Sequence, residues 1–259
     1  MTAIHPTAIV DRGARLHGSV KVGPYSVIGP GVEVGEGTEI GPHVVLSGPM
    51  TMGRNNRVFQ FASLGAISQD KSAKESDATR VEIGDGNTIR EYVTIQRGTL
   101  KQEGLTRVGH DNWLMANVHI AHDCAVGDHN ILANGVTLAG HVTVEDWVIL
   151  GGYVLVHQFC RFGAHSFVGG GTPVERDVAP FVMCDGVPAK ARGINKEGLR
   201  RRGFTAEQID DVESVYRLVF RSEALMADVR KQLAELAATS AAAARYSRFL
   251  EQSKRSIVR

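Results

Sequence analysis

Histidine is the residue type in this chain whose placement suggests chemistry most directly. Six of the ten histidines fall between His119 and His165. An imidazole with its ordinary pKa near 6.5 accepts a proton at neutral pH, and it is also a frequent zinc ligand. The histidine-rich segment therefore raises two kinds of chemistry, general-base catalysis and metal binding.

Large apolar residues recur at every sixth position along most of the chain. One run starts at Val108 and ends at Val174, and another starts at Ile4 and reaches Leu64. A glycine often follows the apolar residue, and the residue four places after it is usually small. A period of six fits neither an α-helix nor an alternating strand, but it fits a short strand and a turn, repeated. We therefore predict triangular coils of about 18 residues, stacked as parallel sheets around an aliphatic core.

Such coils convert sequence separation into position in space. Gly140 lies one coil after His122 and Gln158 lies two coils after it, so these three residues are expected in one column. Two further sets of histidines are placed by the same arithmetic. Those near the column are His119, His141 and His157, whereas His129 and His165 map to another side of the triangle.

The histidine cluster leaves three interpretations open at this point: a metal site, a general base with supporting polar groups, or a chance cluster on a surface. His122 occupies a turn position, two after Ile120, and not an inward position of its repeat. Cys124 and Cys160 occupy the small inward position, which predicts core residues and not nucleophiles. Because a convex prism has no cleft, a site there requires overhanging loops or a neighbouring subunit.

Composition narrows the class of protein. The chain has 259 residues, 43% hydrophobic and 22% charged, with a formal charge of +1, which predicts a folded chain without a nucleic-acid partner. Its apolar stretches are too short for a transmembrane segment, and we do not expect residues 1–10 to act as a signal peptide. Three cysteines without CxxC spacing are typical of a reducing compartment, so we expect a cytoplasmic protein.

The repeat also predicts the domain organisation. We expect a β-helix over residues 1–190, interrupted by polar loops near 66–82 and 100–107, and a helical domain over residues 191–259. Thr205 and Gln208 have the spacing of a helix capping box. The basic triplet at residues 200–202 is suited to an acidic partner, although a solvated helix end remains an equal alternative.

Six segments together resemble the UDP-N-acetylglucosamine 3-O-acyltransferase family, which opens lipid A biosynthesis in Gram-negative bacteria. They are 60–63 (QFAS), 80–84 (RVEIG), 119–124 (HIAHDC), 138–141 (LAGH), 156–160 (VHQFC) and 198–204 (GLRRRGF). The resemblance extends from Ile4 to Arg259. It implies a mainly β fold, a left-handed parallel β-helix with a C-terminal α-helical domain, assembled as a homotrimer with sites at subunit interfaces.

The resemblance also implies a reaction, in which a (R)-3-hydroxyacyl group moves from acidic acyl carrier protein to the 3-hydroxyl of a UDP-sugar. No metal or bound cofactor is implied, since the acyl group arrives on the phosphopantetheine of the carrier. His122 matches the catalytic base and Gly140 matches the backbone donor to the oxyanion. Asp123 either orients His122 or is simply a turn residue.

Further residues match the family by position. Those matching substrate-positioning residues are Gln69, Asp70, His119, His141, His157 and Gln158. Those matching the segment that contacts the nucleotide and the phosphopantetheine arm are Asn195, Glu197, Arg201 and Arg202. Gly170 matches the position that sets acyl length, and a glycine there leaves room for a chain closer to hydroxymyristoyl than to hydroxydecanoyl.

The sequence departs from the family pattern in three places. The loop at 69–79 has an extra residue, so the family lysine corresponds to Lys71 or to Lys74. Gln96 replaces a histidine and Val187 replaces an asparagine. Two alternatives stay open: the N-acyltransferase of the same pathway, and a zinc-dependent hexapeptide carbonic anhydrase. The acceptor is either UDP-N-acetylglucosamine or its 3-amino analogue.

Overall fold

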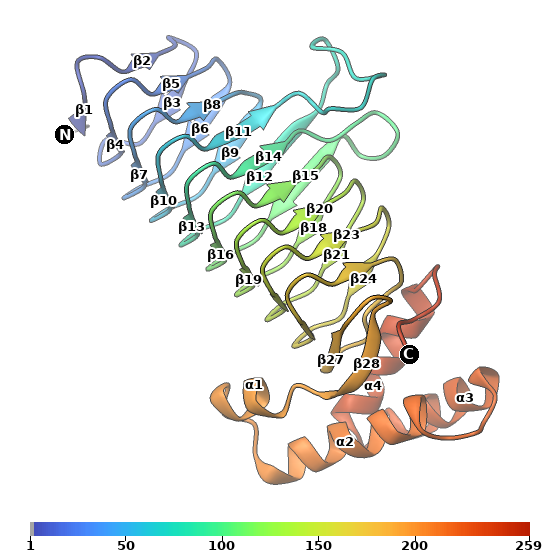
Figure 1. Cartoon of the computed structure of the whole chain (residues 1–259). Coiled ribbons are helices and arrows are strands. Elements are labelled where there is room, and N and C mark those ends of the chain that lie inside the picture. Colours follow the sequence, from blue (N-terminus) through green and yellow to red (C-terminus); the bar gives the residue numbers. More distant parts are fainter. Residues whose placement is uncertain (1–2) are drawn as a thin grey trace.

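The computed structural model describes residues 3–259, which form a long three-sided coil of short strands followed by four helices (Figure 1). Successive coils pair in parallel, with Leu114 opposite Leu132 and Leu132 opposite Leu150. The apolar residue of each repeat points inward, so that Leu114, Ile120 and Leu132 are fully buried. The predicted parallel β-helix with coils of about 18 residues is confirmed.

Each side of the coil is one sheet. The eleven-stranded face contains, in order, β1 (Ala3–Ile4), β4 (Lys21–Val22), β7 (Glu39–Ile40), β10 (Arg57–Val58), β13 (Thr88–Ile89), β16 (Trp113–Leu114), β19 (Ile131–Leu132), β22 (Ile149–Leu150), β25 (Phe167–Val168), β27 (Val182–Asp185) and β28 (Lys190–Ile194). The nine-stranded face contains β2 (Ile9–Val10), β5 (Val27–Ile28), β8 (Val45–Leu46), β11 (Ser63–Ala66), β14 (Thr94–Gln96), β17 (His119–Ile120), β20 (Thr137–Leu138), β23 (Leu155–Val156) and β26 (Pro173–Val174). The eight-stranded face contains β3 (Arg15–Leu16), β6 (Val32–Val34), β9 (Met50–Met52), β12 (Arg80–Ile83), β15 (Leu105–Val108), β18 (Ala125–Val126), β21 (Thr143–Val144) and β24 (Arg161–Phe162).

Both chain insertions leave the coil at the same corner. The first lies between β11 and β12 at residues 67–79, and the second lies between β14 and β15 at residues 97–104. Each therefore connects the nine-stranded face to the eight-stranded face, and the two loops project side by side in Figure 1. We call this edge the histidine corner, because the turn after β17, which contains His122, belongs to it.

The bounds of the two insertions correct the sequence prediction, which extended the loops to residues 82 and 107. Residues 80–83 and 105–108 are strands that pair with each other in register. The reason is local burial: Val81 is fully buried and Leu105 is nearly so, and these apolar side chains hold the polar segments between them in the sheet.

A buried ladder of asparagines runs along one edge of the core. The amide of Asn87 donates to Asn56 Oδ1 at 3.0 Å, and that of Asn112 donates to Asn87 Oδ1 at 3.0 Å. Asn130 continues the ladder, accepting a hydrogen bond from the Val148 amide at 2.7 Å. Each side chain thus satisfies peptide groups at a turn where the backbone leaves the sheet ladder.

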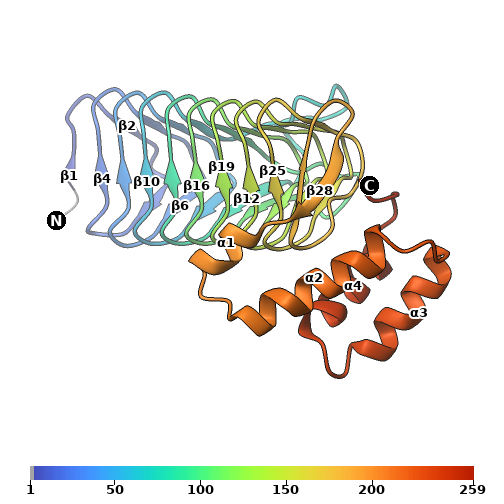
Figure 2. The ribbon, with the colours of Figure 1, turned by 60° about the horizontal axis from the view of Figure 1, so that its bottom comes forward.

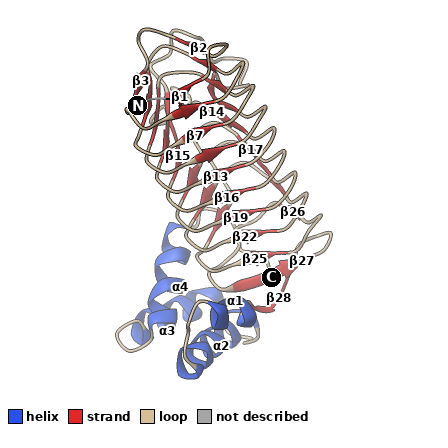
Figure 3. Ribbon diagram, turned by 90° about the vertical axis from the view of Figure 1, so that its left-hand side faces the viewer, coloured by secondary structure: helices blue, strands red, loops and turns tan. Residues whose placement is uncertain are grey.

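The helical part contains α1 (Lys196–Arg201), α2 (Ala206–Phe220), α3 (Met226–Leu236) and α4 (Ala241–Gln252). It lies against the C-terminal end of the coil (Figures 2 and 3). The Thr205–Gln208 capping box is present at the start of α2. The helices bury Val212, Val229 and Phe249, whereas Leu225 and Leu236, at the two ends of α3, are 74% and 43% exposed.

The predicted domain boundary at residue 190 is also shifted by the structure. Strand β28 pairs antiparallel with β27, with Val182 opposite Ile194, so the eleven-stranded face continues to Ile194. The helices begin at Lys196 because Asn195 caps α1 by accepting a hydrogen bond from the Gly198 amide.

Candidate active site

His122 lies in the turn that follows β17 and is nearly buried, with 10% of its side chain exposed. Its Nδ1 is 2.9 Å from Oδ2 of Asp123. With the carboxylate accepting from Nδ1–H, the lone pair of the imidazole is on Nε2. The turn thus presents an oriented base at the histidine corner, next to the two insertions.

Gly140 lies directly over the His122 ring on the next coil. A Cβ atom on this glycine would come within 2.7 Å of His122 Nε2, so no larger residue fits without moving the imidazole. Within residues 3–259 the Gly140 N–H donates to no other group, although Gly140 O accepts from the Phe159 amide at 3.2 Å. The predicted column of His122 and Gly140 is present, with an unengaged peptide N–H beside an imidazole.

Asp123 has both of the roles that the sequence left as alternatives. Its φ of 58° makes it the positive-φ residue of its turn. Its carboxylate is 1% exposed and also accepts from Thr99, at Oδ1 from the amide (2.9 Å) and at Oδ2 from the hydroxyl (2.6 Å). Thr99 belongs to the second insertion, and no sequence signal pointed to it.

His141 and His119 flank the base on opposite sides in sequence. The ring of His141 meets that of His122 edge-on at 5.0 Å and stacks on Phe159 at 4.4 Å. Burial lowers the pKa of both His141 and His119, so both imidazoles are neutral at pH 7. His119 Nδ1 is 2.7 Å from the Thr94 hydroxyl. Two predicted positioning residues thus lie beside His122 as neutral imidazoles.

His157 and Gln158 contact the C-terminal tail. His157 is exposed, and its Nδ1 is 3.0 Å from a guanidinium nitrogen of Arg255, which also donates to the carbonyl oxygen of Gln158. Arg176 and Lys254 line the same pocket as His157. The structure thus places His157, one coil beyond Gly140, at a pocket lined by three basic residues and one acidic residue, Glu175, with Gln158 beside it.

The predicted loop residues lie where the two insertions meet. The Asp70 carboxylate forms an ion pair with Lys101 at 2.5 Å, and the Gln69 amide donates to Gln96 Oε1 at 3.1 Å. The hydrogen bond from Lys101 holds the pKa of Asp70 far below its usual range. Lys71 and Lys74 were the sequence candidates for the loop lysine, but the lysine paired with Asp70 is Lys101, on the second insertion.

The predicted nucleotide-contacting residues are at a different corner. Arg202 lies over the Trp147 ring at 5.2 Å and donates to His165 Nδ1 at 3.2 Å. Asn195 uses its amide to donate to the carbonyl oxygen of His165 at 3.0 Å. Trp147 and His165 lie in turns between the eight-stranded and eleven-stranded faces, so this group does not meet His122 within one chain.

Glu197 and Arg201 are exposed on α1 and pair with each other at 2.9 Å. Gly170 occupies the third corner, in the turn after β25, where an added Cβ would lie 3.2 Å from the carbonyl oxygen of Gly152. The predicted site residues are therefore distributed over all three corners of the coil.

One subset of the site has the spacing of metal ligands. His122, Asp123 and His141 offer ligand atoms that lie within 4.8 Å of one another. Two of these three groups already bond to each other through His122 Nδ1, and Thr99 donates to both oxygens of the carboxylate. A metal ion here would have to displace these hydrogen bonds.

The cysteines are core residues in the structure. Cys124 and Cys160 are 1% and 0% exposed, and the Cys124 thiol donates to the carbonyl oxygen of Ala139. Burial raises the pKa of both thiols to about 12, so neither supplies a thiolate at neutral pH.

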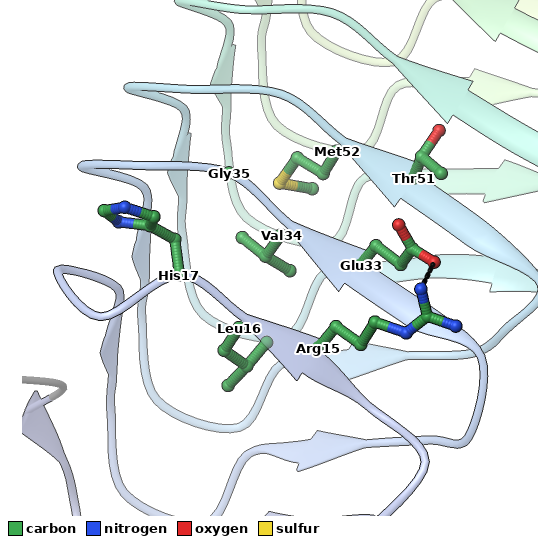
Figure 4. A pocket seen from close by; sticks show the side chains of 8 residues that line it. All are labelled: Arg15, Leu16, His17, Glu33, Val34, Gly35, Thr51 and Met52. Carbon is green, nitrogen blue, oxygen red and sulfur yellow. Dashed lines mark ion pairs between the residues drawn. The ribbon is translucent and has the colours of Figure 1, made fainter.

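A separate pocket opens in the N-terminal coils, between β3, β6 and β9 (Figure 4). An ion pair between Arg15 and Glu33, 3.3 Å long, lies beside it. Its histidine, His17, bonds to the hydroxyl of Ser19 at 2.9 Å. The pocket is on the eight-stranded face, several coils before His122, and contributes nothing to the histidine corner.

Comparison with known proteins identifies the family of the chain. Residues 3–48 and 105–140 match the bacterial transferase hexapeptide family, and residues 177–258 match the family described as Udp N-acetylglucosamine O-acyltransferase, domain 2. Among curated relatives, the acyl-(acyl-carrier-protein)–UDP-N-acetylglucosamine O-acyltransferase of Herminiimonas arsenicoxydans is 51% identical and that of Thiobacillus denitrificans 49% identical, each over 100% of both chains.

Solved structures are similar over the same length. The UDP-N-acetylglucosamine acyltransferase of Francisella novicida superposes with a TM-score of 0.97 at 41% identity, covering 99% of this chain and 94% of that one. The UDP-N-acetylglucosamine O-acyltransferase of Moraxella catarrhalis has a TM-score of 0.96 at 44% identity, covering 99% of each.

The fold and the oriented imidazole define the class: this is a hexapeptide-repeat acyltransferase with a parallel β-helix. The relatives then specify the family. The chain belongs to the acyl-(acyl-carrier-protein)–UDP-N-acetylglucosamine O-acyltransferases. Of the alternatives left by the sequence, neither the N-acyltransferase nor the carbonic anhydrase is the family that these matches support.

Proposed function

We propose that this enzyme transfers a (R)-3-hydroxyacyl group from acyl carrier protein to the 3-hydroxyl of UDP-N-acetylglucosamine, the first step of lipid A biosynthesis. The observation that carries the proposal is the juxtaposition of His122 and the unengaged Gly140 N–H, with Asp123 on the far side of the imidazole. A base and an oxyanion donor at one point are what direct acyl transfer to a hydroxyl requires.

The mechanism follows from the orientation of the ring. His122 Nε2 takes the proton of the sugar 3-hydroxyl as that oxygen attacks the thioester carbonyl carbon. The carbonyl oxygen becomes an oxyanion, which the Gly140 N–H stabilises. Collapse of this intermediate breaks the carbon–sulfur bond, and the imidazolium returns its proton to the departing thiolate. Asp123 keeps Nδ1 protonated and stabilises the transient positive charge. The buried cysteines take no part, and no metal is required.

We further propose a homotrimer with active sites between subunits. The outward strand positions of the nine-stranded face carry no charged side chain other than histidine within residues 3–259: they are Ile9, Val27, Val45, Ser63, Thr94, His119, Thr137, Leu155 and Pro173. The eight-stranded face carries arginine and glutamate at several equivalent positions, among them Arg15, Glu33, Glu82, Arg107 and Arg161. Burying charges is costly, so the nine-stranded face is better suited to subunit contact than the eight-stranded face.

A cyclic threefold assembly also accounts for the distribution of the site residues over different corners. In such an assembly, different surfaces of neighbouring subunits meet, so one corner of a subunit lies against another corner of its neighbour. Arg201 and Arg202, or Gly170, would then approach the His122 of the neighbour, where they are suited to the UDP diphosphate and the acyl chain respectively. Sedimentation velocity tests this directly: a stable active monomer would contradict it.

The carrier protein is expected at the helical part. Its acidic surface complements the basic triplet at residues 200–202 and the basic pocket formed by Arg176, Lys254 and Arg255. The described residues include no helix long and apolar enough to cross a membrane. Three buried, unpaired cysteines support a reducing compartment, so we place the reaction in the cytoplasm.

The test is a panel of acyl carrier protein donors and UDP-sugar acceptors, read by mass spectrometry. We expect transfer to UDP-N-acetylglucosamine, with a preference for long 3-hydroxyacyl chains because Gly170 leaves room for them. The panel includes the 3-amino analogue as acceptor, and transfer to that compound alone would reassign the acceptor. Gly170→Met should shift the preference toward shorter chains, and unchanged selectivity would remove Gly170 from chain-length control.

His122→Ala tests the base within the same assay. We expect kcat to fall at least about a hundredfold, which is the usual range for losing a general base. His17→Ala is the matched control, because His17 is exposed in the N-terminal coils. Near wild-type turnover of His122→Ala would contradict the mechanism.

Zinc-dependent catalysis is the second candidate, favoured by the spacing of His122, Asp123 and His141. Metal analysis of the protein before and after chelation separates the two. Acyl transfer that persists in metal-depleted protein supports the direct mechanism, whereas stoichiometric zinc that activity requires would reject it.

A further inference from the structure

We propose that Thr99, in the second insertion, is a positioning residue for the reaction: it holds the Asp123 carboxylate so that His122 keeps Nδ1 protonated and presents Nε2 to the acceptor. This inference rests on the proposed role of His122 as the base. Thr99 lies outside the motif around His122, but in this proposal it fixes part of the active-site geometry.

Thr99 uses both of its donors on the same carboxylate. Its amide donates to Oδ1 of Asp123 at 2.9 Å, and its hydroxyl donates to Oδ2 at 2.6 Å, the oxygen that also accepts from His122 Nδ1. Thr99 is 4% exposed and the Asp123 side chain 1% exposed, so water does not compete for these bonds. Two donors on one carboxylate restrict its rotation about the Cβ–Cγ bond, which a single bond to His122 would not do.

The insertion is itself held in place from both ends. The Arg97 amide donates to the carbonyl oxygen of Ala66 at 2.9 Å, and the buried guanidinium of Arg97 pairs with Glu75 of the first insertion at 2.6 Å. In β15, the strand that follows the insertion, the hydroxyl of Thr106 accepts a hydrogen bond from the Asp123 amide at 2.8 Å. Asp123 is therefore fixed through both its backbone and its side chain by residues 99 and 106.

Several charged and titratable groups surround the pair. His141 Nδ1 lies 3.8 Å from Asp123 Oδ2 and is buried without a hydrogen-bond partner among residues 3–259. His119 lies on the same coil as His122. The charges of Lys101 and Asp70, in the two insertions, act on the pKa of His141 in opposite directions: Lys101 lowers it and Asp70 raises it. If the Thr99 hydroxyl were absent, the carboxylate would lose a donor, become a stronger acceptor toward Nδ1–H and favour the imidazolium form of His122.

The experiment compares Thr99→Val with Thr99→Ser. Valine has the same shape, and its methyl group occupies the place of the hydroxyl and keeps water out; serine retains the hydroxyl. We expect Thr99→Val to lower kcat about tenfold at pH 7 with both KM values within about twofold, and to move the acidic limb of the kcat/KM profile about one pH unit higher. Thr99→Ser should stay within about twofold of wild type.

A second readout does not depend on turnover. Labelled histidine in the uncomplexed enzyme reports the titration of His122 by NMR, with His122→Ala used to assign its signal. We expect the His122 midpoint to rise by about one pH unit in Thr99→Val and to return toward wild type in Thr99→Ser. An unmoved midpoint together with an unchanged kcat would overturn the proposal.

The control is Thr38→Val, which removes a fully buried threonine hydroxyl in the N-terminal coils, where it donates to Gly53 O at 3.0 Å. It should lower stability without moving either readout. An equal loss of kcat in Thr38→Val would mean that Thr99 contributes only to stability, which would contradict the proposal. Failure of the mechanism is distinguishable, because His122→Ala would then retain turnover whatever Thr99→Val does.

Discussion

The decisive contact at the residue scale is between a glycine and an imidazole. Gly140 has ordinary negative φ, so its identity is not explained by backbone conformation. It is explained by space, since any Cβ there meets the His122 ring. In the mechanism proposed above, the same close approach places the peptide N–H where the negative charge of the intermediate would develop, so that packing and the proposed catalysis would require glycine for one shared reason.

Gly140→Ala is therefore expected to displace the imidazole and to lower kcat by about a hundredfold, since small misplacements of a catalytic group have effects of that order. Steady-state kinetics measure this, with circular dichroism to confirm that the coil persists. Gly18→Ala is the matched control, because a Cβ added to Gly18 meets nothing within 4 Å. If the two variants had similar kinetic constants, Gly140 would have no role in the reaction.

At the scale of the elements, the stability of the coil depends on polar residues as well as on the aliphatic stack. Asn56, Asn87, Asn112 and Asn130 are at most 1% exposed, and they link successive coils along one corner. They occupy the small inward position of the repeat, the position for which the sequence predicted core residues at Cys124 and Cys160. Their amides supply hydrogen bonds where peptide groups turn away from the sheets, which an alanine cannot do.

Asn112→Ala should lower the free energy of unfolding by about 1–3 kcal/mol. It removes the side chain that accepts a hydrogen bond from the backbone amide of Asn130 and donates one to the carbonyl oxygen of Gly127, so both buried groups lose their partner. Urea denaturation followed by circular dichroism measures the change. Asn134→Ala, at an exposed turn position, is expected to change it by less than about 0.5 kcal/mol. Equal effects for both would mean that the ladder contributes no stability of its own.

At the scale of the whole molecule, a stack of aromatic rings joins the helical part to the coil. His165 lies between Trp147 and Phe181, with Phe204 against its edge, and it accepts a hydrogen bond from Arg202. Burial lowers the pKa of His165 to about 4, and the charges of Arg202 and Arg245 act in the same direction. A neutral imidazole is therefore part of the contact that orients α1.

This contact predicts a pH dependence of stability. An unfolded histidine binds its proton near pH 6.5 but the folded His165 only near pH 4, so its contribution is present above about pH 6.5 and is lost as the pH falls toward 4. The loss at the acidic end is on the order of 3 kcal/mol. Thermal melts from pH 7 to pH 4 should show a smaller decrease for His165→Gln than for wild type. His17→Gln, at an exposed site, should follow wild type, and parallel curves for His165→Gln would contradict the prediction.

Much of the architecture was predictable from the sequence because the repeat is strictly local. Each large apolar residue marks a position that points into the core, as Leu114 and Ile120 do. The period of about 18 residues then places Gly140 over His122 without further information. The chain positions of the two insertions were also visible, since they interrupt the period. Their bounds were not, because residues 80–82 and 105–107 are polar in part and become strands by pairing with each other and with β9 and β18 on either side.

What the sequence determined by itself is therefore the fold class, the coil spacing, the column that contains His122 and, through the family motifs, the reaction class. The tertiary structure alone decided that Thr99 holds Asp123, that Lys101 pairs with Asp70, and that Arg202 and Gly170 occupy corners away from His122. The physical reason is that a repeat specifies positions along the coil, whereas a loop between repeats has no period, and its contacts depend on how it folds back onto its neighbours.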